Sequence, residues 1–310
     1  MTAGSAIYNP MTLPVVHHPD YDARLPASHR FPMSKYTALR LHMERTGLLE
    51  RTTLLQPAAA PREWLALAHD GGYVDRVLTC TVPPAIEREI GFAINERTSR
   101  RAQLATAGTV LAARTALDSG IACNMAGGSH HARYEQGAGY CTFNDVAVAA
   151  LVLLAAREIG RALVVDCDVH QGDGTARILA GEDRVFTFSM HCDKNYPVRK
   201  AQSDLDIALP DGMGGAAYLD TLRDALPVLF ERSRPDVVFY NAGVDVHGED
   251  RLGKLALTND DIRARDETVI GFFRERGIAV CGVIGGGYSS DIDALAARHA
   301  LLFETASWFA

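Results

Sequence analysis

The segment from Val164 to Gly174 carries three aspartates and a histidine directly after a short apolar run of the 310-residue chain. Residues two apart in an extended chain point to the same face, so Asp168 and His170 can face one cation. Oxygen and nitrogen ligands together suit zinc or ferrous iron. A polar turn that caps a helix is the alternative, which Asp173-Gly174-Thr175 alone would support. We interpret the segment as a transition-metal site.

A calcium-binding loop would also explain closely spaced acidic residues such as Asp166, Asp168 and Asp173. Such a loop requires glycine at its sixth position and glutamate at its twelfth. Those positions hold Gln171 and Arg177 here, which argues against the calcium loop.

Asp245 is the candidate for a third ligand, because it follows another apolar run and a permissive glycine in the segment 240–245. Taken alone, an aspartate in this place would better be interpreted as a helix cap. Three protein ligands leave one coordination position for water, as in catalytic rather than structural zinc sites. A metal held in this way lowers the pKa of water and polarises a carbonyl group.

Two adjacent histidines, His130 and His131, follow a Gly-Gly-Ser turn after a third apolar run. Amide hydrolysis needs a base that accepts the proton of water and an acid that protonates the leaving amine. Asp166 and Asp173, which are not used as ligands, can each accept a hydrogen bond from one imidazole, set its tautomer and raise its pKa. Ser129 stands beside the pair, but the G-x-S-x-G turn of serine hydrolases does not surround it. The pair therefore indicates general acid–base catalysis.

A fourth apolar run ends in three glycines and a tyrosine, Gly285 to Tyr288. The glycines also fit a tight turn or a phosphate cradle, but no G-x-G-x-x-G helix start follows, which argues against dinucleotide binding. A tyrosine on such a loop can donate its hydroxyl to the oxyanion that develops opposite a metal.

Short apolar runs rich in β-branched residues recur along the chain and predict strands buried on both faces of a parallel sheet. They lie at Ile121–Ala126, Arg161–Asp166, Arg184–Met190, Asp236–Asn241 and Ile278–Ile284. Helical patterns between them lie at Ser99–Ser119, Asn144–Glu158, Ala216–Arg232 and Asp260–Arg276. The alternation predicts one α/β domain over residues 1–310, with a mostly parallel, doubly wound sheet flanked by helices. Ligands bind beyond the carboxyl ends of the strands in this architecture, where the polar residues above lie.

The first third of the chain, from Tyr8 to Thr98, is less regular and contains interspersed proline and histidine. We expect it to wrap the sheet and to shape the mouth of the site. Arg97, Arg100 and Arg101 form a short basic patch, which we interpret as the solvated start of a helix.

Charge and composition exclude several classes of function. The net charge is −7, which disfavours a nonspecific nucleic-acid binder, because such a protein needs a basic face. The six cysteines include no CxxC pair and predict neither disulfides nor a cysteine zinc site. Met1 to Pro14 shows no signal-peptide pattern, and apolar runs such as Val146 to Ala156 are too short to span a membrane. We expect a soluble cytoplasmic protein with no nucleic-acid or membrane partner.

Together these segments resemble the histone-deacetylase-like family of the arginase/deacetylase superfamily. The matching motifs occur in the order of the family: Gly127–His131, Gly139–Asp145, Asp166–Gly174, Ser189–His191, Asn241–Asp245 and Gly286–Tyr288. The segment His69–Tyr73 is similar to the family's approach segment. The segment 241–253 is most similar to the class IV branch and its bacterial relatives, and Phe31–Lys35 to bacterial deacetylase-like proteins.

The resemblance implies an arginase/deacetylase α/β fold with zinc, or alternatively ferrous iron, held by Asp168, His170 and Asp245. It implies a histidine pair as general acid and base, two orienting aspartates and a transition-state tyrosine: His130, His131, Asp166, Asp173 and Tyr288. The walls of an acyl-lysine tunnel are implied at Gly139, Tyr140, Tyr196 and Gly286. By the same analogy, a structural potassium ion lies near Asp166, Asp168, His170, Ser189 and Met190.

The predicted activity is the hydrolysis of an acyl group from an amine nitrogen, with acyl-lysine of proteins as the expected substrate and either short or fatty acyl chains. An acetylated polyamine or another small acylated amine is the alternative substrate. A binding module without turnover is the alternative from another class, but Tyr288 and both histidines are present. Ser129 and Ser289–Asp291 depart from the family pattern. These departures concern the pocket wall and the acyl length it accepts rather than a catalytic group.

Overall fold

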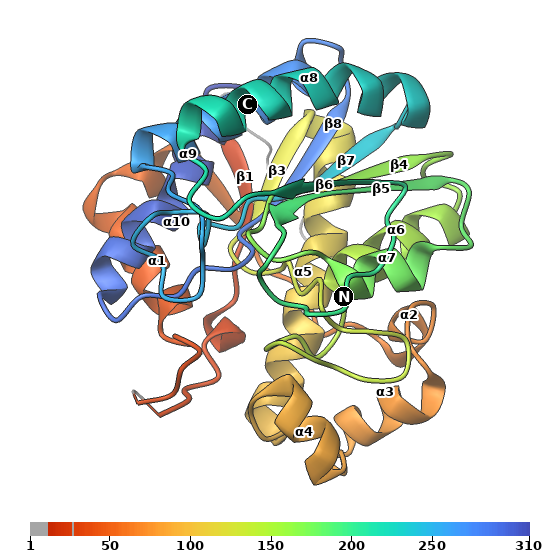
Figure 1. The fold of residues 1–310 in the computed structure, drawn as a ribbon. Coiled ribbons are helices and arrows are strands. Elements are labelled where there is room, and N and C mark those ends of the chain that lie inside the picture. Colours follow the sequence, from red (N-terminus) through yellow and green to blue (C-terminus); the bar gives the residue numbers. More distant parts are fainter. Residues whose placement is uncertain (1–11, 27) are drawn as a thin grey trace.

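The computed structural model describes residues 12–26 and 28–310, so most of the Met1 to Pro14 segment lies outside the described residues. An eight-stranded sheet runs through the molecule with strand order β2-β1-β3-β8-β7-β4-β5-β6 (Figure 1). All paired strands are parallel. The strands are β1 (Leu13–Val16), β2 (Thr52–Leu55), β3 (Ile121–Asn124), β4 (Ala162–Asp166), β5 (Val185–Cys192), β6 (Leu205–Leu209), β7 (Val237–Asn241) and β8 (Ala279–Val283).

The five predicted strands are present at nearly the predicted positions as β3, β4, β5, β7 and β8. These strands are almost wholly buried, as expected for continuous apolar runs inside a parallel sheet. The first third was expected to wrap the sheet, but part of it belongs to the sheet itself, because β1 and β2 extend the sheet at one edge. Their sequences, LPVV and TTLL, are short, and the first contains a proline, which weakens the local strand signal.

Helices connect the strands and flank the sheet. They are α1 (Lys35–Arg45), α2 (Arg62–Leu65), α3 (Gly71–Leu78), α4 (Pro84–Ile90), α5 (Glu96–Ser119), α6 (Asp145–Ala155), α7 (Asp173–Leu179), α8 (Gly215–Ser233), α9 (Asn259–Arg274) and α10 (Ile292–Ala306), with short 3₁₀ turns at Pro19–Tyr21 and Leu48–Arg51. The longest, α5, begins at a reciprocal cap in which the side chains of Asn95 and Thr98 each accept from the other's backbone N–H.

Two apolar layers enclose the sheet (Figure 1). Helices α1, α8, α9 and α10 pack on one face, and α5, α6 and α7 pack mainly on the other. A third apolar cluster joins α3 and α4 to the first turns of α5. The architecture is therefore the predicted doubly wound α/β sheet with helices on both sides.

The interpretation of the basic patch as a solvated helix start is wrong for Arg101. This side chain is buried on the inner side of α5, where its guanidinium donates to the carbonyl of Tyr21 at 3.1 Å and to the hydroxyl of Tyr36. The two tyrosines come from the irregular first third, and so local sequence could not place them against α5. No helix among the described residues is long and apolar enough to cross a membrane.

Candidate active site and metal centre

The three candidate ligands lie together where two neighbouring strands end. Asp168 and His170 follow β4, Asp245 follows β7, and these two strands pair directly. The Nδ1 atom of His170 lies 3.1 Å from Asp168 Oδ1 and 3.1 Å from Asp245 Oδ2. One possible ligand atom of each residue lies within 4.8 Å of the other two, and all three side chains are buried. The cluster can therefore hold one cation between two carboxylates and an imidazole.

The charges in this cluster fit a divalent cation. Burial and the negative charge of Asp168 raise the pKa of Asp245 to about 7. Burial also acts to raise the pKa of Asp168. The imidazoles of His130 and His170 outweigh this effect and hold the pKa of Asp168 well below its usual value. Burial disfavours a charged His170, yet its hydrogen bonds to both carboxylates raise the pKa to about 10. Two buried carboxylates thus compete for one positive charge, and a divalent cation would balance both.

Gly286, which was predicted to form part of the substrate wall, lies directly against the ligands. Its backbone N–H donates to Asp168 Oδ2 at 2.7 Å. A Cβ atom at this position would lie 2.1 Å from Asp245 Oδ2, so only glycine leaves the carboxylates in place. The loop after β8 thereby closes one side of the cluster.

The two histidines each contact one of the carboxylates that were paired with them from the sequence. The His130 Nδ1 atom lies 2.7 Å from Asp166 Oδ2, and the His131 Nδ1 atom lies 2.9 Å from Asp173 Oδ1. The two Nε2 atoms lie 3.1 Å apart. Because a carboxylate can only accept, each Nδ1 atom donates the proton of its hydrogen bond, which leaves the two Nε2 atoms facing each other.

The surroundings separate the pKa values of the two imidazoles. Burial disfavours a charged His130, but the carboxylates of Asp166 and Asp168 outweigh it and raise the pKa to about 9. Burial and the positive charge of His130 lower the pKa of His131 to about 3. Near neutral pH the pair therefore consists of an imidazolium and a neutral imidazole, the two forms that general acid–base chemistry needs.

Two buried polar residues support this arrangement although sequence reasoning gave them no role. The carboxylate of Asp145, in the first turn of α6, accepts hydrogen bonds from the N–H groups of Gly128 at 3.1 Å and Ser129 at 2.7 Å. The amide of Asn241, at the end of β7, donates to Asp166 Oδ1 at 2.9 Å. Both residues stood inside matched motifs, and a polar residue at the end of an apolar run was the signal that could have identified Asn241.

Tyr288 lies beside the cluster on the loop after β8. Its ring centroid is 6.1 Å from that of His170, and its side chain is buried. Burial and the negative charges of Asp245 and Asp168 raise the pKa of Tyr288 well above its usual value, so the hydroxyl stays protonated and can donate. A third residue without a predicted role, the buried Lys35, donates to the carbonyl of Gly285 at 3.1 Å and supports the same loop.

A cavity of about 330 Å³ opens above these residues. Its floor includes His131, His170 and Tyr288, and its walls include Gly139, Tyr140 and Tyr196. The Tyr196 ring stands edge-on to His131, with centroids 4.7 Å apart. Gly139 has a positive φ of 54°, and a Cβ there would lie 2.6 Å from the His131 ring. Three of the four predicted wall residues, Gly139, Tyr140 and Tyr196, therefore line one cavity together with His131 and His170.

The residues predicted to surround potassium come from two neighbouring strands. Ser189 stands opposite Asp166 in the register of β4 and β5, and Met190 follows it. The Ser189 hydroxyl lies 3.0 Å from His191 Nδ1. The potassium ion itself stays a prediction.

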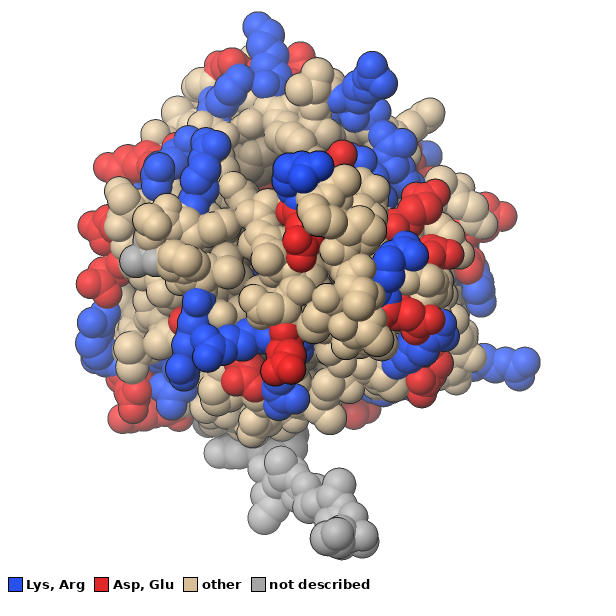
Figure 2. Space-filling view, turned by 90° about the horizontal axis from the view of Figure 1, so that it is seen from below, with Lys and Arg blue, Asp and Glu red and all other residues tan. Residues whose placement is uncertain are grey.

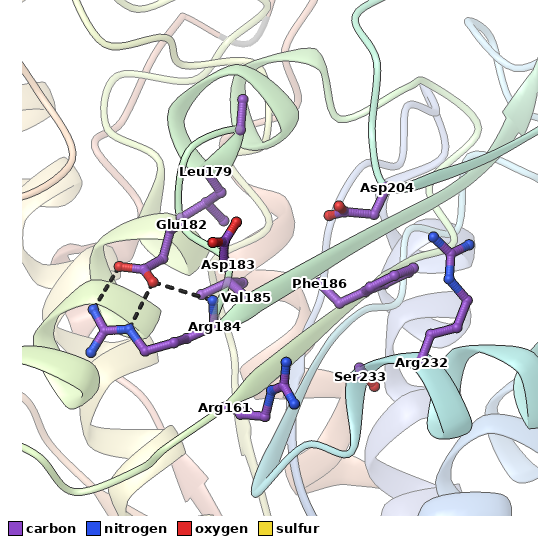
Figure 3. A pocket seen from close by; sticks show the side chains of 11 residues that line it. Arg161, Leu179, Glu182, Asp183, Arg184, Val185, Phe186, Asp204, Arg232 and Ser233 are labelled. Atoms are coloured by element: carbon purple, nitrogen blue, oxygen red, sulfur yellow. Dashed lines mark hydrogen bonds and ion pairs between the residues drawn. The ribbon is translucent and has the colours of Figure 1, made fainter.

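A second hollow, of about 130 Å³, lies where β4 and β5 begin, at the opposite end of these strands (Figure 3). Its charged side chains are largely engaged with their neighbours: Arg184 pairs with Glu182 at 2.6 Å, and Asp204 accepts from the Thr187 hydroxyl at 2.8 Å. It contains no histidine. This hollow therefore lacks the histidine and metal-ligand cluster that lies at the carboxyl ends of the strands.

Comparison with known proteins identifies the family of the chain. Residues 29–303 match the family model described as the histone deacetylase domain. Histone deacetylase 2 of Arabidopsis thaliana is 30% identical over 269 residues, which cover 84% of this chain and 70% of that protein. A probable deacetylase of Methanothermobacter thermautotrophicus is 28% identical over 293 residues, covering 89% and 86%. An uncharacterized protein of a Picosynechococcus strain is 44% identical over 296 residues, covering 96% and 99%.

Two solved structures share the fold. The crystal structure of the HDA15 HD domain superposes with a TM-score of 0.79 at 21% identity, covering 95% of this chain and 89% of that one. The acetylpolyamine aminohydrolase from Burkholderia pseudomallei superposes with a TM-score of 0.77 at 22% identity, covering 95% and 98%. The predicted arginase/deacetylase fold is thus confirmed.

Proposed function

Because the chain belongs to the histone deacetylase family, we propose that it is a zinc-dependent deacylase that hydrolyses the bond between an acyl group and an amine nitrogen, with acyl-lysine as its substrate. The proposal rests on the arrangement of metal-ligating and proton-transferring side chains. Three buried side chains of a metal-ligating type lie beside two histidines, each backed by its own carboxylate. One ligand and one histidine of this group, His170 and His131, line the same cavity. Metal ligands and a proton-transfer pair together are what amide hydrolysis by water requires.

Asp168, His170 and Asp245 would hold the zinc ion, which when bound polarises the acyl carbonyl and lowers the pKa of water. His131 is neutral near pH 7 and faces the cavity, so its imidazole accepts a proton from the attacking water. His130 keeps its proton and adds positive charge beside the site where negative charge develops. The proton then passes to the amine nitrogen, the carbon–nitrogen bond breaks, and the products are a carboxylate and a free amine.

The Tyr288 hydroxyl would donate to the acyl oxygen as that atom gains negative charge. Its raised pKa keeps the proton in place, and its burial excludes competing water. Such a donor contributes more in the transition state than in the ground state, which is the condition for catalysis.

The charges at the cavity mouth favour acyl-lysine in a peptide over a polyamine. Two exposed arginines, Arg30 and Arg88, line the mouth, and Glu89 is the only acidic residue among the lining residues. Glu89 itself lies 3.9 Å from the guanidinium of Arg133. A polyamine carries further positive charges, which two exposed arginines would repel.

A panel of substrates tests the proposal. Zinc-loaded protein is incubated with peptides that carry short or long acyl groups on lysine, and separately with acetylated polyamines, and the free amine is quantified. We expect turnover of acyl-lysine peptides with a higher kcat/KM than that of any polyamine. Preferred turnover of a polyamine would overturn the substrate, and binding of acyl-lysine without turnover of any compound would instead support a binding module.

A further inference from the structure

A buried arginine contacts the two loops that carry Asp168 and Asp245. Arg265 belongs to α9, is fully buried, and reaches the ends of β4 and β7. Its Nη1 atom donates to the carbonyl of Gly243 at 2.6 Å and to the carbonyl of Cys167 at 3.3 Å. One guanidinium nitrogen thus joins the two chain segments that carry the candidate ligands.

The two carbonyls lie one and two residues before the ligands. Cys167 directly precedes Asp168, and Gly243 stands two residues before Asp245. The N–H sides of the same peptide units are also fixed, because Asp168 N donates to Asp166 Oδ1 at 3.1 Å and Val244 N donates to the Gly286 carbonyl at 2.8 Å. Rotation of either peptide would therefore break bonds on both sides, and Arg265 supplies the bond that the two have in common.

The charge of the guanidinium is balanced locally. Asp266 Oδ1 accepts from Arg265 Nε at 3.0 Å and Nη2 at 2.8 Å, and also from the Tyr240 hydroxyl at 2.6 Å. A buried ion pair of this kind contributes little net stability compared with apolar residues of similar size. Its effect is therefore expected in the geometry that it imposes on the two loops.

We propose that Arg265 is a positioning residue of the metal centre, which holds the loops of Asp168 and Asp245 at the spacing that one cation requires. This inference rests on the proposed zinc site. Partners that orient metal ligands indirectly typically change metal affinity on the order of 10–100-fold when they are removed. The affinity for zinc should therefore report the loss of Arg265 independently of activity.

The test compares four variants with the wild type in zinc affinity, measured by competition with a chelator, and in the thermal midpoint of the metal-free protein. Arg265→Met should weaken zinc binding on the order of 10–100-fold. Arg265→Lys keeps the charge without the planar fork and should recover only part of the affinity. Tyr240→Phe removes a bond to Asp266 but none to the loops, so it should lower the midpoint and keep the affinity. Arg263→Met, on the same helix and partly exposed, should change neither quantity.

The outcomes separate the inference from the proposed function. A wild-type protein that binds no zinc overturns the proposed function itself. A wild type that binds zinc while Arg265→Met and Arg265→Lys bind it equally well overturns the role of Arg265. The role is also overturned if Tyr240→Phe loses as much affinity as the Arg265 variants, because general destabilisation then explains the loss. Should Arg265→Met fail to fold, Arg265→Lys carries the comparison alone.

Discussion

At the scale of single residues, the neighbours of each imidazole decide which proton it holds. Catalysis as proposed needs His131 neutral and His130 protonated. Since the pKa of His131 is lowered to about 3 and that of His130 is raised to about 9, this state persists on both sides of the ordinary histidine value of 6.5. We expect a bell-shaped profile of kcat/KM against pH, whose two limbs belong to the coupled pair.

The carboxylates next to the histidines provide the control for this profile. Asp166→Asn removes the negative charge that raises the pKa of His130, so the alkaline limb should move to lower pH. Steady-state kinetics from pH 5 to 10, on wild type and variant, measure the shift. An alkaline limb that stays in place in Asp166→Asn would exclude His130 as the group responsible.

Tyr288→Phe isolates the role of one hydroxyl, because the variant keeps the ring and its contacts. Loss of one oxyanion donor typically lowers kcat on the order of 10²–10³-fold, or roughly 3–4 kcal/mol. Zinc content and the affinity for a hydroxamate inhibitor should change much less. Single-turnover hydrolysis beside calorimetric binding measures both, and equal hydrolysis by wild type and variant would remove Tyr288 from catalysis.

At the scale of elements, His69 connects the histidine loop to α6. Its Nδ1 atom lies 2.8 Å from the Arg133 carbonyl, and its Nε2 accepts from the Asn144 N–H at 2.9 Å. Burial lowers the pKa of His69 to about 4. The unfolded chain therefore takes up a proton first as the pH falls, and the contribution of neutral His69 is complete above pH 6.5 and is lost toward pH 4.

The expected consequence is a loss of unfolding free energy on the order of 3 kcal/mol across this window from His69 alone. Denaturant unfolding at pH 7 and at pH 4.5 measures it. His69→Gln has no group that titrates there, so its stability should fall less than that of the wild type on acidification. His42→Gln, at a partly exposed position of α1, serves as the control and should keep nearly the wild-type response.

The elements also explain which parts of the site could be predicted. Strands β4, β7 and β8 were recognised because continuous apolar runs ended in polar residues, and parallel neighbours bring those ends together. The positioning role of Arg265 was missed although a signal existed. In α9 the buried face runs through Ile262, Val269 and Phe273, and Arg265 falls at a helical spacing where an apolar residue is expected. A charged residue on the buried face of an amphipathic helix indicates a specific partner.

Other features depend on contacts between distant segments, which no local pattern contains. Lys35 and Arg101 can be buried because residues far away in the chain accept hydrogen bonds from them. The acceptor is the Gly285 carbonyl for Lys35, and the Tyr21 carbonyl and the Tyr36 hydroxyl for Arg101. The similarity of the segment 241–253 to the class IV branch of the family stays a prediction.

At the scale of the whole molecule, basic and acidic side chains are interspersed over the face that Figure 2 shows. Selectivity is therefore expected from the few charges at the cavity mouth rather than from a field of one sign. Arg88→Glu should lower KM for acetylated polyamines and raise KM for acidic acyl-lysine peptides, severalfold at low salt and less at high salt. Arg97→Glu, which lines a different hollow, is the matched control. Unchanged selectivity in Arg88→Glu would show that the mouth does not sort substrates by charge.

The central claim is that one zinc ion, held by Asp168, His170 and Asp245, enables hydrolysis of acyl-lysine. The most direct test strips the protein with a chelator, adds zinc stepwise, and follows conversion of an acyl-lysine peptide to the unacylated peptide by mass spectrometry. We expect activity that rises linearly and levels off at about one equivalent of zinc, with no activity at any zinc level in Asp168→Ala. Full hydrolysis by the stripped protein or by Asp168→Ala, or a fully zinc-loaded wild type that leaves every acyl-lysine peptide intact, would contradict it.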